Sequence, residues 1–180
     1  MNRIAIPSAE QTPAASLPLL DAVNQQLGIV PNLMKVLGNS PAALAGYLSL
    51  SGALGKGTLG AKTGERIALA VAELNGCNYC LAAHGYLAST LAKLDAVEID
   101  ANRRGGSGDP KAAAAVRFAS HVVTSRGHTS DAEVTAVKGA GFSDAEVIEI
   151  VLHVALNTLT SYVNEVAKTE IDFPIADPLR

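Results

Sequence analysis

The chain has 180 residues, of which 48% are hydrophobic and only 17% are charged, and it has a formal net charge of −3 and a pI of about 5.8. No basic cluster supplies the positive surface that nucleic-acid binding needs, and no stretch reaches the roughly 20 uninterrupted apolar residues that span a bilayer. The start "MNRIAIPSAEQTP" lacks the long apolar run of a signal peptide, so we expect a cytoplasmic protein.

Strand patterns are nearly absent, and Gly, Pro and Asn residues separate a series of helical segments. Residues 1–18 form a lead-in whose prolines exclude an early helix. Helices are predicted in "LPLLDAVNQQLG", which ends at Gly28, and in the short "PNLMKVLGN". Ser40 before Pro41 predicts the start of the next helix, "PAALAGYLSLSGALG". The following "GKGTLG" is interpreted as a connector, since it lacks the spacing of a phosphate-binding loop.

The middle of the chain predicts two helices joined by a tight turn. Thr63 is expected to cap the first, which carries "GERIALAVAEL" and ends at Asn75-Gly76. The second is "CNYCLAAHGYLASTLAKL". The segment "DANRRGGSGD", around Gly105, is predicted to be a loop long and glycine-rich enough to be mobile.

The last third of the chain predicts three more helices. Their starts are Asp109 before Pro110, and the capping boxes Ser130 with Glu133 and Ser143 with Glu146. The final helix is expected to run from about 144 to 168. The fold class is therefore predicted to be all-α, in a single domain over 1–180 with its core at about 19–175.

The chain has two cysteines, Cys77 and Cys80, which lie at a predicted helix start. His84 follows Cys80 by four residues. On a helix these three residues fall within about 60° of one another. Such a short loop contributes almost no stabilisation as a cross-link, so the pair indicates redox chemistry or a metal. The helix N-terminus favours a thiolate, and His84 can take a proton from Cys80 directly or through a water.

An acidic partner for His84 is predicted on the preceding helix. Glu65 lies about as far before the Asn75-Gly76 turn as His84 lies after it, so the two come level in an antiparallel pair. Glu65 also shares a stripe with small and apolar residues, where a carboxylate needs a partner. Glu73 is the competing acid, and its position beside Arg66 favours solvent. We expect a relay from Glu65 through His84 to Cys80.

Glu65, Cys77, Cys80 and His84 form the pattern E-x11-C-x2-C-x3-H. In this pattern the chain resembles the AhpD-like alkylhydroperoxidases of the carboxymuconolactone decarboxylase superfamily. The stretches "GIVPNLMKVLGNSPAALAGYLSLSGAL" and "LHVALNTLTSYVNEVAKTEIDFP" are similar to its peroxidase-related branch, so the resemblance covers roughly residues 25–175. It implies a helical fold that assembles into dimers, trimers or hexamers. It also implies one cysteine that attacks a hydroperoxide, a second that resolves the sulfenic acid as a disulfide, and reduction by an external thiol or dithiol. No bound cofactor or metal is expected.

The chain departs from the family pattern at Tyr79, where well-known members have a histidine between the two cysteines. That difference bears on peroxidase efficiency more than on thiol–disulfide chemistry, and Tyr79 could still offer a hydroxyl. We expect Cys80 to attack the peroxide, because general-base help contributes roughly 10²–10⁴ in rate whereas the helix dipole at Cys77 is worth about 0.3–1 kcal/mol. Cys77 is then expected to resolve the intermediate and to exchange with the outside reductant.

Other readings of the cysteine motif stay open. The pair could be two small buried residues, or could bind zinc with His84 and a fourth ligand such as Glu65, although no second CxxC or HxxxH exists to complete a closed site. His121 and His128 are interpreted as ordinary positions near a helix end.

A polar stripe runs along the otherwise apolar last helix: His153, Asn157, Thr160 and Asn164. Such a stripe either lines the active-site cavity or makes hydrogen bonds between helices or subunits.

Three functions are compatible with these residues. The first is a thiol-dependent hydroperoxide reductase or disulfide oxidoreductase. The others are a lactone decarboxylase-type lyase and a non-catalytic redox-sensing assembly protein. The low charge, against about 25% in a typical chain, predicts either a homo-oligomer or a very apolar core.

Overall fold

In the computed structural model, which describes residues 3–179, the chain is all-α, with nine helices and no strand in that range. The described range leaves out Met1, Asn2 and Arg180. Met1 and Asn2 belong to the predicted lead-in. The helices are α1 (Leu17–Leu27), α2 (Asn32–Leu37), α3 (Pro41–Leu54), α4 (Ala61–Leu74), α5 (Asn78–Thr90), α6 (Ala96–Arg103), α7 (Pro110–Thr124), α8 (Asp131–Gly139) and α9 (Asp144–Ala167).

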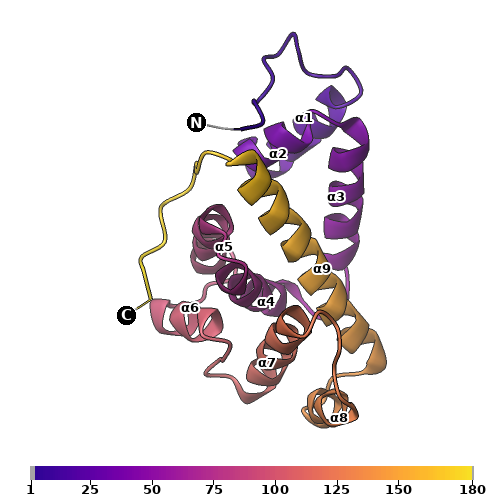
Figure 1. Ribbon diagram of the computed structural model, residues 1–180, viewed down its shortest axis with the longest axis vertical. Coiled ribbons are helices and arrows are strands. Elements are labelled where there is room, and N and C mark those ends of the chain that lie inside the picture. The colour runs from indigo at the N-terminus through magenta and orange to yellow at the C-terminus, as the bar shows by residue number, and fades with distance from the viewer. Residues whose placement is uncertain (1–2, 180) are drawn as a thin grey trace.

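The helix α4 lies at the centre of the fold and packs against α5, α6, α7 and α9. Its Ile67, Leu69 and Val71 are fully buried, so this helix is enclosed on nearly all sides. The long α9 crosses the molecule from α8 to the region of α1 and α2, and the segment after it runs back past α5 toward α6 (Figure 1). The α4–α5 hairpin is therefore held against α9, which positions the cysteine motif.

Four of the predicted capping residues begin helices in the structure: Ser40, Asp109, Ser130 and Ser143. Ser40 accepts a hydrogen bond from the backbone N–H of Ala43, and Asp109 accepts one from Ala112. Both predicted capping boxes form, at the starts of α8 and α9. Gly28 adopts the left-handed conformation that ends α1.

The predicted cap at Thr63 is wrong. The helix α4 begins two residues earlier, at Ala61, and its N-cap is Gly60, whose φ of 79° suits glycine. Thr63 lies in the first turn. The connector before it is held by Glu149 of α9, whose carboxylate accepts hydrogen bonds from the N–H groups of Thr58 and Leu59 at 3.0 and 2.8 Å.

The helix α6 was not expected from the sequence, and it takes up the start of the predicted mobile loop. Asp95 caps it by accepting from the N–H of Glu98. The rest of the loop is tied down, because Asn102 donates to the carbonyl of Gly106 at 2.9 Å and Gly108 donates to the Glu98 carboxylate at 2.8 Å. This loop is a structured part of the fold.

We expect Glu98→Gln to lower the free energy of unfolding by about 3 kcal/mol, because Arg66, which is buried, loses its charged partner 2.8 Å away. Burial raises the pKa of Glu98, but hydrogen bonds from Ser107, Gly108, Asn102 and Arg66 outweigh it and lower the pKa to about 2 from 4.5. The stabilisation is thus present above about pH 4.5 and is lost as the pH falls toward 2. Urea titrations of both proteins at pH 7 and pH 3 measure this, and a difference that does not shrink at pH 3 would contradict it.

Of the described helices, α9 alone is long and apolar enough to cross a membrane by length and composition. It packs against α4, α7, α3 and α5, and its buried residues include the polar Asn157, Ser161 and Asn164. These contacts hold α9 within the helical bundle.

Candidate active site

The two cysteines lie at the N-terminal end of α5 and form a disulfide, with their Cα atoms 5.2 Å apart. Cys77 is the N-cap residue of the helix, and Cys80 lies in its first turn. The backbone N–H of Cys80 donates to the Sγ of Cys77 at 3.2 Å. When the disulfide is reduced, this helix end will stabilise negative charge on Cys77.

The two sulfurs differ in what they face. Cys77 is fully buried (0% exposed) and packs in a core cluster with residues such as Leu37 and Leu44. Cys80, 4% exposed, lines a cavity of about 610 Å³ that Cys77 does not line. A molecule in the cavity therefore meets Cys80. This geometry does not favour the expectation that Cys77 exchanges with the outside reductant, because its side chain turns into the core.

The structure brings Glu65 and His84 together across the α4–α5 hairpin. Oε2 of Glu65 lies 2.9 Å from Nδ1 of His84, and the two side chains are about one-fifth exposed. Both residues line the same cavity as Cys80. With Nδ1 held by the carboxylate, Nε2 is the ring nitrogen left for proton transfer.

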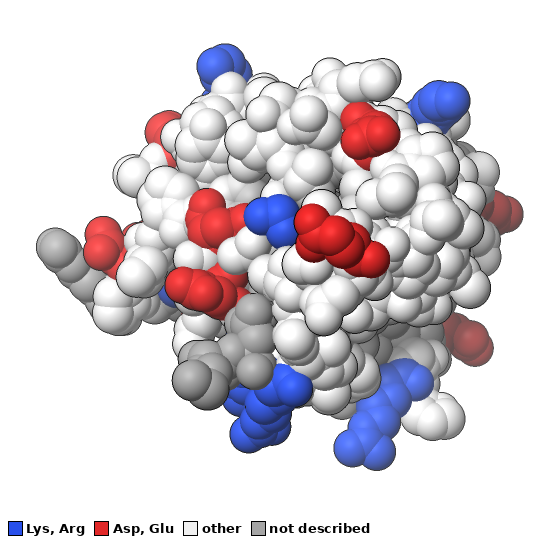
Figure 2. Space-filling model, turned by 90° about the horizontal axis from the view of Figure 1, so that it is seen from above, with Lys and Arg blue, Asp and Glu red and all other residues white. Residues whose placement is uncertain are grey.

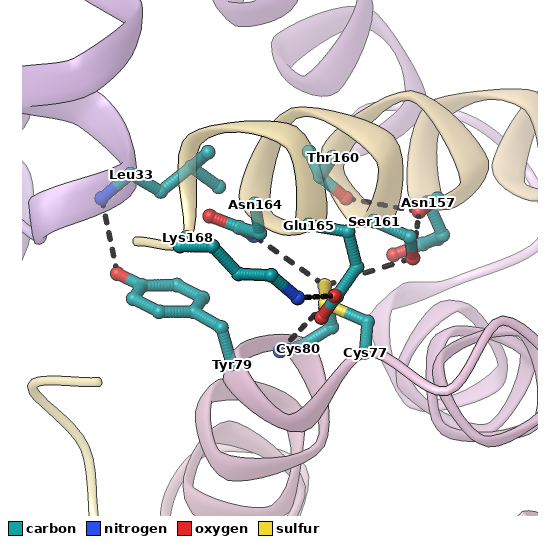
Figure 3. Close-up of a disulfide and its surroundings, with 10 residues drawn as sticks. All are labelled: Leu33, Cys77, Tyr79, Cys80, Asn157, Thr160, Ser161, Asn164, Glu165 and Lys168. Atoms are coloured by element: carbon teal, nitrogen blue, oxygen red, sulfur yellow. Dashed lines mark hydrogen bonds and ion pairs between the residues drawn. A yellow bond between two sulfur atoms is a disulfide. The ribbon is translucent and has the colours of Figure 1, made fainter. Parts of the chain in front are cut away.

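The Sγ of Cys80 makes its polar contacts with α9. Among the described residues these are Ser161, whose Oγ is 3.6 Å away, and Asn164, whose Nδ2 donates at 3.5 Å. Figure 3 shows both side chains pointing from α9 toward the disulfide. No direct hydrogen bond between Cys80 and His84 is among these contacts, so a proton moving between them has to cross the cavity through a water or the substrate.

His153 and Asn157, from the predicted polar stripe, both line the cavity. His153 fits against α4 because residue 64 is glycine: a Cβ there would lie 2.9 Å from the imidazole. Burial lowers the pKa of His153, while Glu149 and Glu65 act in the opposite direction. Asn157 donates to the carbonyl of His153 at 2.8 Å, so its amide is satisfied within its own helix.

Tyr79 does not offer a free hydroxyl to the site. Its Oη accepts a hydrogen bond from the N–H of Leu33 at 3.1 Å and donates to Asp172 at 2.8 Å, and its ring meets Phe173 edge-on (Figure 3 shows the contact with Leu33). Burial raises the pKa of Tyr79, and the Asp172 carboxylate adds to the effect. Tyr79 thus anchors the segment after α9 to α5 and α2.

We expect Tyr79→Phe to lower the free energy of unfolding by about 1–3 kcal/mol, because it leaves Asp172 and the N–H of Leu33 without their shared partner. The rate of Cys80 oxidation should change little, since the hydroxyl is not part of the proton path. Thermal melts and thiol-oxidation rates measure the two effects separately. A large loss of the oxidation rate in a variant of unchanged stability would contradict this and show that the Tyr79 hydroxyl takes part in the reaction.

The remaining candidates lie elsewhere. Glu73 forms an ion pair with Arg103 at 2.8 Å and does not line the cavity, and His121 pairs with Glu133 at 2.7 Å. His128 is exposed. Within residues 3–179, no three His, Cys, Asp or Glu side chains gather in a metal-binding arrangement.

Sequence reasoning missed Ser161 and Tyr47. Ser161 contacts the Cys80 sulfur, and Tyr47 lines the cavity from α3. Burial raises the pKa of Tyr47, a hydrogen bond from Ser51 lowers it, and the charge of Glu65 raises it. The signal for Tyr47 is its spacing of four residues from Ser51 on a largely apolar helix. The signal for Ser161 is its place between Asn157 and Asn164, at helical spacing from both.

The rest of the cavity wall is mostly apolar. Its apolar members include Leu27, Ile29, Leu33, Met34, Leu48, Leu54, Leu87, Leu91, Leu156 and Phe173. Polar and ionisable groups thus line a largely apolar chamber, among them Glu65, His84, His153, Asn157, Thr160, Asn164, Tyr47 and Cys80.

The family model for the carboxymuconolactone decarboxylase family matches residues 41–121, which contain Glu65, both cysteines and His84. No curated protein matches the chain in sequence.

Solved structures share its fold. A peroxidase-related protein with an AhpD core from Ralstonia eutropha JMP134 has a TM-score of 0.85 and 22% identity, over 95% of this chain and 92% of that one. A peroxidase-related protein from Silicibacter sp. TM1040 has a TM-score of 0.81 and 21% identity, over 93% and 89%. The debrominase Bmp8, solved without ligand and as a variant with 2,3,4-tribromopyrrole, has a TM-score of 0.77 and 19% identity; the ligand-free structure is matched over 94% of this chain and 92% of that one. At these identities the likeness shows the fold.

Proposed function

We propose that this chain, whose residues 41–121 match the model of the carboxymuconolactone decarboxylase family and whose fold is shared with a protein that has an AhpD core, is a thiol-dependent hydroperoxide reductase that works through its Cys77–Cys80 disulfide. One observation carries the proposal. Cys80, the accessible half of the disulfide, faces the same apolar cavity as the hydrogen-bonded pair Glu65–His84.

The oxidative half of the cycle uses the reduced pair. The Cys80 thiolate attacks the terminal oxygen of the hydroperoxide, the O–O bond breaks, and the alkoxide takes a proton and leaves as an alcohol. Cys80 becomes a sulfenic acid. The Cys77 thiolate then attacks the Cys80 sulfur, hydroxide leaves with a proton as water, and the disulfide forms.

The reductive half draws two electrons from an external thiol or dithiol. A reductant thiolate entering the cavity attacks Cys80, and Cys77 leaves as a thiolate that the helix N-terminus stabilises. A second reductant thiol then releases Cys80. This order gives Cys77 the role of resolving and leaving group, and places exchange with the reductant at Cys80.

Glu65 and His84 move the protons. The carboxylate orients the ring and stabilises its protonated form, as a carboxylate does for a catalytic histidine elsewhere. His84 first removes the thiol proton, through a water or the substrate, and then returns it to the departing alkoxide.

The direct test counts free thiols before and after one equivalent of an organic hydroperoxide. The reduced protein should lose two thiols per chain and release one equivalent of alcohol, and excess dithiol should restore both thiols. Thiols that stay free after peroxide treatment would overturn the proposal.

Two alternatives are distinguished by also measuring turnover of lactone without reductant and turnover of hydroperoxide with excess dithiol. A lactone decarboxylase-type lyase turns over lactone without any reductant. A redox-sensing assembly protein forms the disulfide but does not turn over. The fold shared with a debrominase adds a useful control, since dehalogenation of a bromopyrrole would consume thiol without peroxide.

We also propose that the chain is a cytoplasmic homo-oligomer. An apolar stripe of α9 is exposed, comprising Ile148, Val151, Leu152, Leu159, Tyr162 and Val166. Only 17% of the residues are charged, and most of the face in Figure 2 is uncharged, with the charged side chains gathered in separate groups. The stripe repeats at about every seven residues, which suits packing against the same helix of a second copy.

We expect the double variant Leu159→Glu, Tyr162→Glu to dissociate the oligomer, because it places charges in the centre of the stripe. Size-exclusion chromatography with light scattering measures the mass of both proteins. A wild type that is monomeric at micromolar concentration would contradict this part of the proposal.

A further inference from the structure

Asn164 is the side chain that supports the reacting sulfur. It lies in the last turns of α9, is only 2% exposed, and donates through Nδ2 to the Sγ of Cys80 at 3.5 Å (Figure 3). Ser161 also contacts that sulfur, but its hydroxyl hydrogen is already given to the carbonyl of Asn157, 2.7 Å away. Asn164 is therefore the fixed hydrogen-bond donor to Cys80, and Ser161 is an acceptor for the thiol.

The other half of the same amide has no partner. Oδ1 of Asn164 is buried, and no described residue donates to it. A buried acceptor left without a donor is destabilising, and nearly all such atoms in folded proteins are paired. Asn164 lines the cavity that Cys80 faces, and its side chain has to turn slightly for Oδ1 to meet a donor on a molecule bound there, because the atom itself is not exposed in the disulfide form.

We propose that Asn164 is a catalytic residue that binds the hydroperoxide O–H through Oδ1 while it holds the Cys80 sulfur through Nδ2. This inference rests on the proposed function. One planar amide then contacts both reacting groups, since its oxygen and nitrogen are fixed on the same carbon. The terminal oxygen of the hydroperoxide is thereby held next to the sulfur that attacks it.

The step balances with this geometry. The thiolate electron pair of Cys80 forms the S–O bond to the terminal oxygen, and the O–O pair leaves with the alkoxide. The alkoxide takes its proton from the imidazolium of His84. The hydrogen of the terminal oxygen stays in place, so the sulfenic acid keeps its hydrogen bond to Oδ1 until Cys77 attacks.

The experiment uses the full chain carrying Cys77→Ser, in which Cys80 is the one thiol. Two reagents are compared: tert-butyl hydroperoxide, which carries the O–H, and iodoacetamide, which alkylates the same thiolate and needs no O–H acceptor at Oδ1. The variants are Asn164→Leu, which removes donor and acceptor, and Asn164→Asp, which keeps the shape and the acceptor. Circular dichroism checks that each is folded.

Two results are expected. Asn164→Leu should slow alkylation at neutral pH about ten-fold and move the pH midpoint of alkylation upward, because the thiolate loses a donor. It should slow peroxide oxidation by about a further ten-fold, because the substrate contact is lost as well. Asn164→Asp should also shift the midpoint upward, but the ratio of oxidation to alkylation should stay near that of the parent.

Thr169→Val is the control, because Thr169 is another buried polar residue, two positions after the end of α9, and it does not line the cavity. Its alkylation midpoint and rate ratio should not change. Equal slowing of both reagents in Asn164→Leu would overturn the substrate contact, and no slowing of either would overturn the whole inference. If the parent is alkylated but never oxidised by hydroperoxide, the proposed function fails, and the alkylation midpoint still tests the contact with sulfur.

Discussion

Replacing Cys80 by serine is expected to abolish oxidation of the protein by an organic hydroperoxide, whereas Cys77→Ser should still undergo one stoichiometric oxidation per chain. The reason is access: Cys80 faces the cavity, and Cys77 is fully buried behind it. Without Cys77 the sulfenic acid has no resolving thiol, so it persists and can be trapped. Intact mass spectrometry with dimedone measures the trapped sulfenic acid.

Both variants should fold, which makes the comparison clean. Serine is itself a preferred N-cap residue, so Cys77→Ser keeps an acceptor for the N–H of Cys80. The variant that lacks both cysteines supplies the blank for non-specific oxidation. If Cys80→Ser still consumed one equivalent of peroxide and Cys77→Ser consumed none, the roles of the two sulfurs would be reversed.

The fold was predictable where its signals are local. Capping boxes at Ser130 and Ser143 act within four residues, and both mark helix starts in the structure. The helix α6 escaped prediction because it is short, and because its Glu98 is secured by Arg66 from α4, a contact that no local pattern reveals. Thr63 was misassigned for a different, local reason: Gly60, with its φ of 79°, is the N-cap residue of α4, three positions before Thr63.

The candidate site divides in the same way. The contact between Glu65 and His84 was predictable because a tight turn fixes the register of the two helices that carry them. Ser161 and Asn164 reach Cys80 from a helix about eighty residues further along the chain, and the packing of α9 on α5 depends on the whole core. The structural role of Tyr79 could not be predicted, because it depends on a hydrogen bond to Asp172, which lies in a segment without secondary structure.

The second large effect is expected at the proton relay. His84→Gln should lower the rate of Cys80 oxidation by organic hydroperoxide about 100-fold, because the thiol loses its base and the alkoxide loses its acid. Glu65→Gln should lower the same rate about ten-fold, because the amide can still orient the ring but no longer stabilises its charge. The double variant should resemble His84→Gln alone, since the two residues act as one unit. Stopped-flow measurement of thiol loss at pH 7 gives all three rates.

Glu73→Gln is the matched control for the relay. It makes the same chemical change on the same helix as Glu65→Gln, but Glu73 pairs with Arg103 and does not line the cavity. Its oxidation rate should equal that of the wild type even if its stability falls, so a loss specific to Glu65 cannot be ascribed to damage to α4. Normal oxidation rates in both Glu65→Gln and His84→Gln would remove the relay from the mechanism and leave Asn164 as the main polar contact of the reacting sulfur.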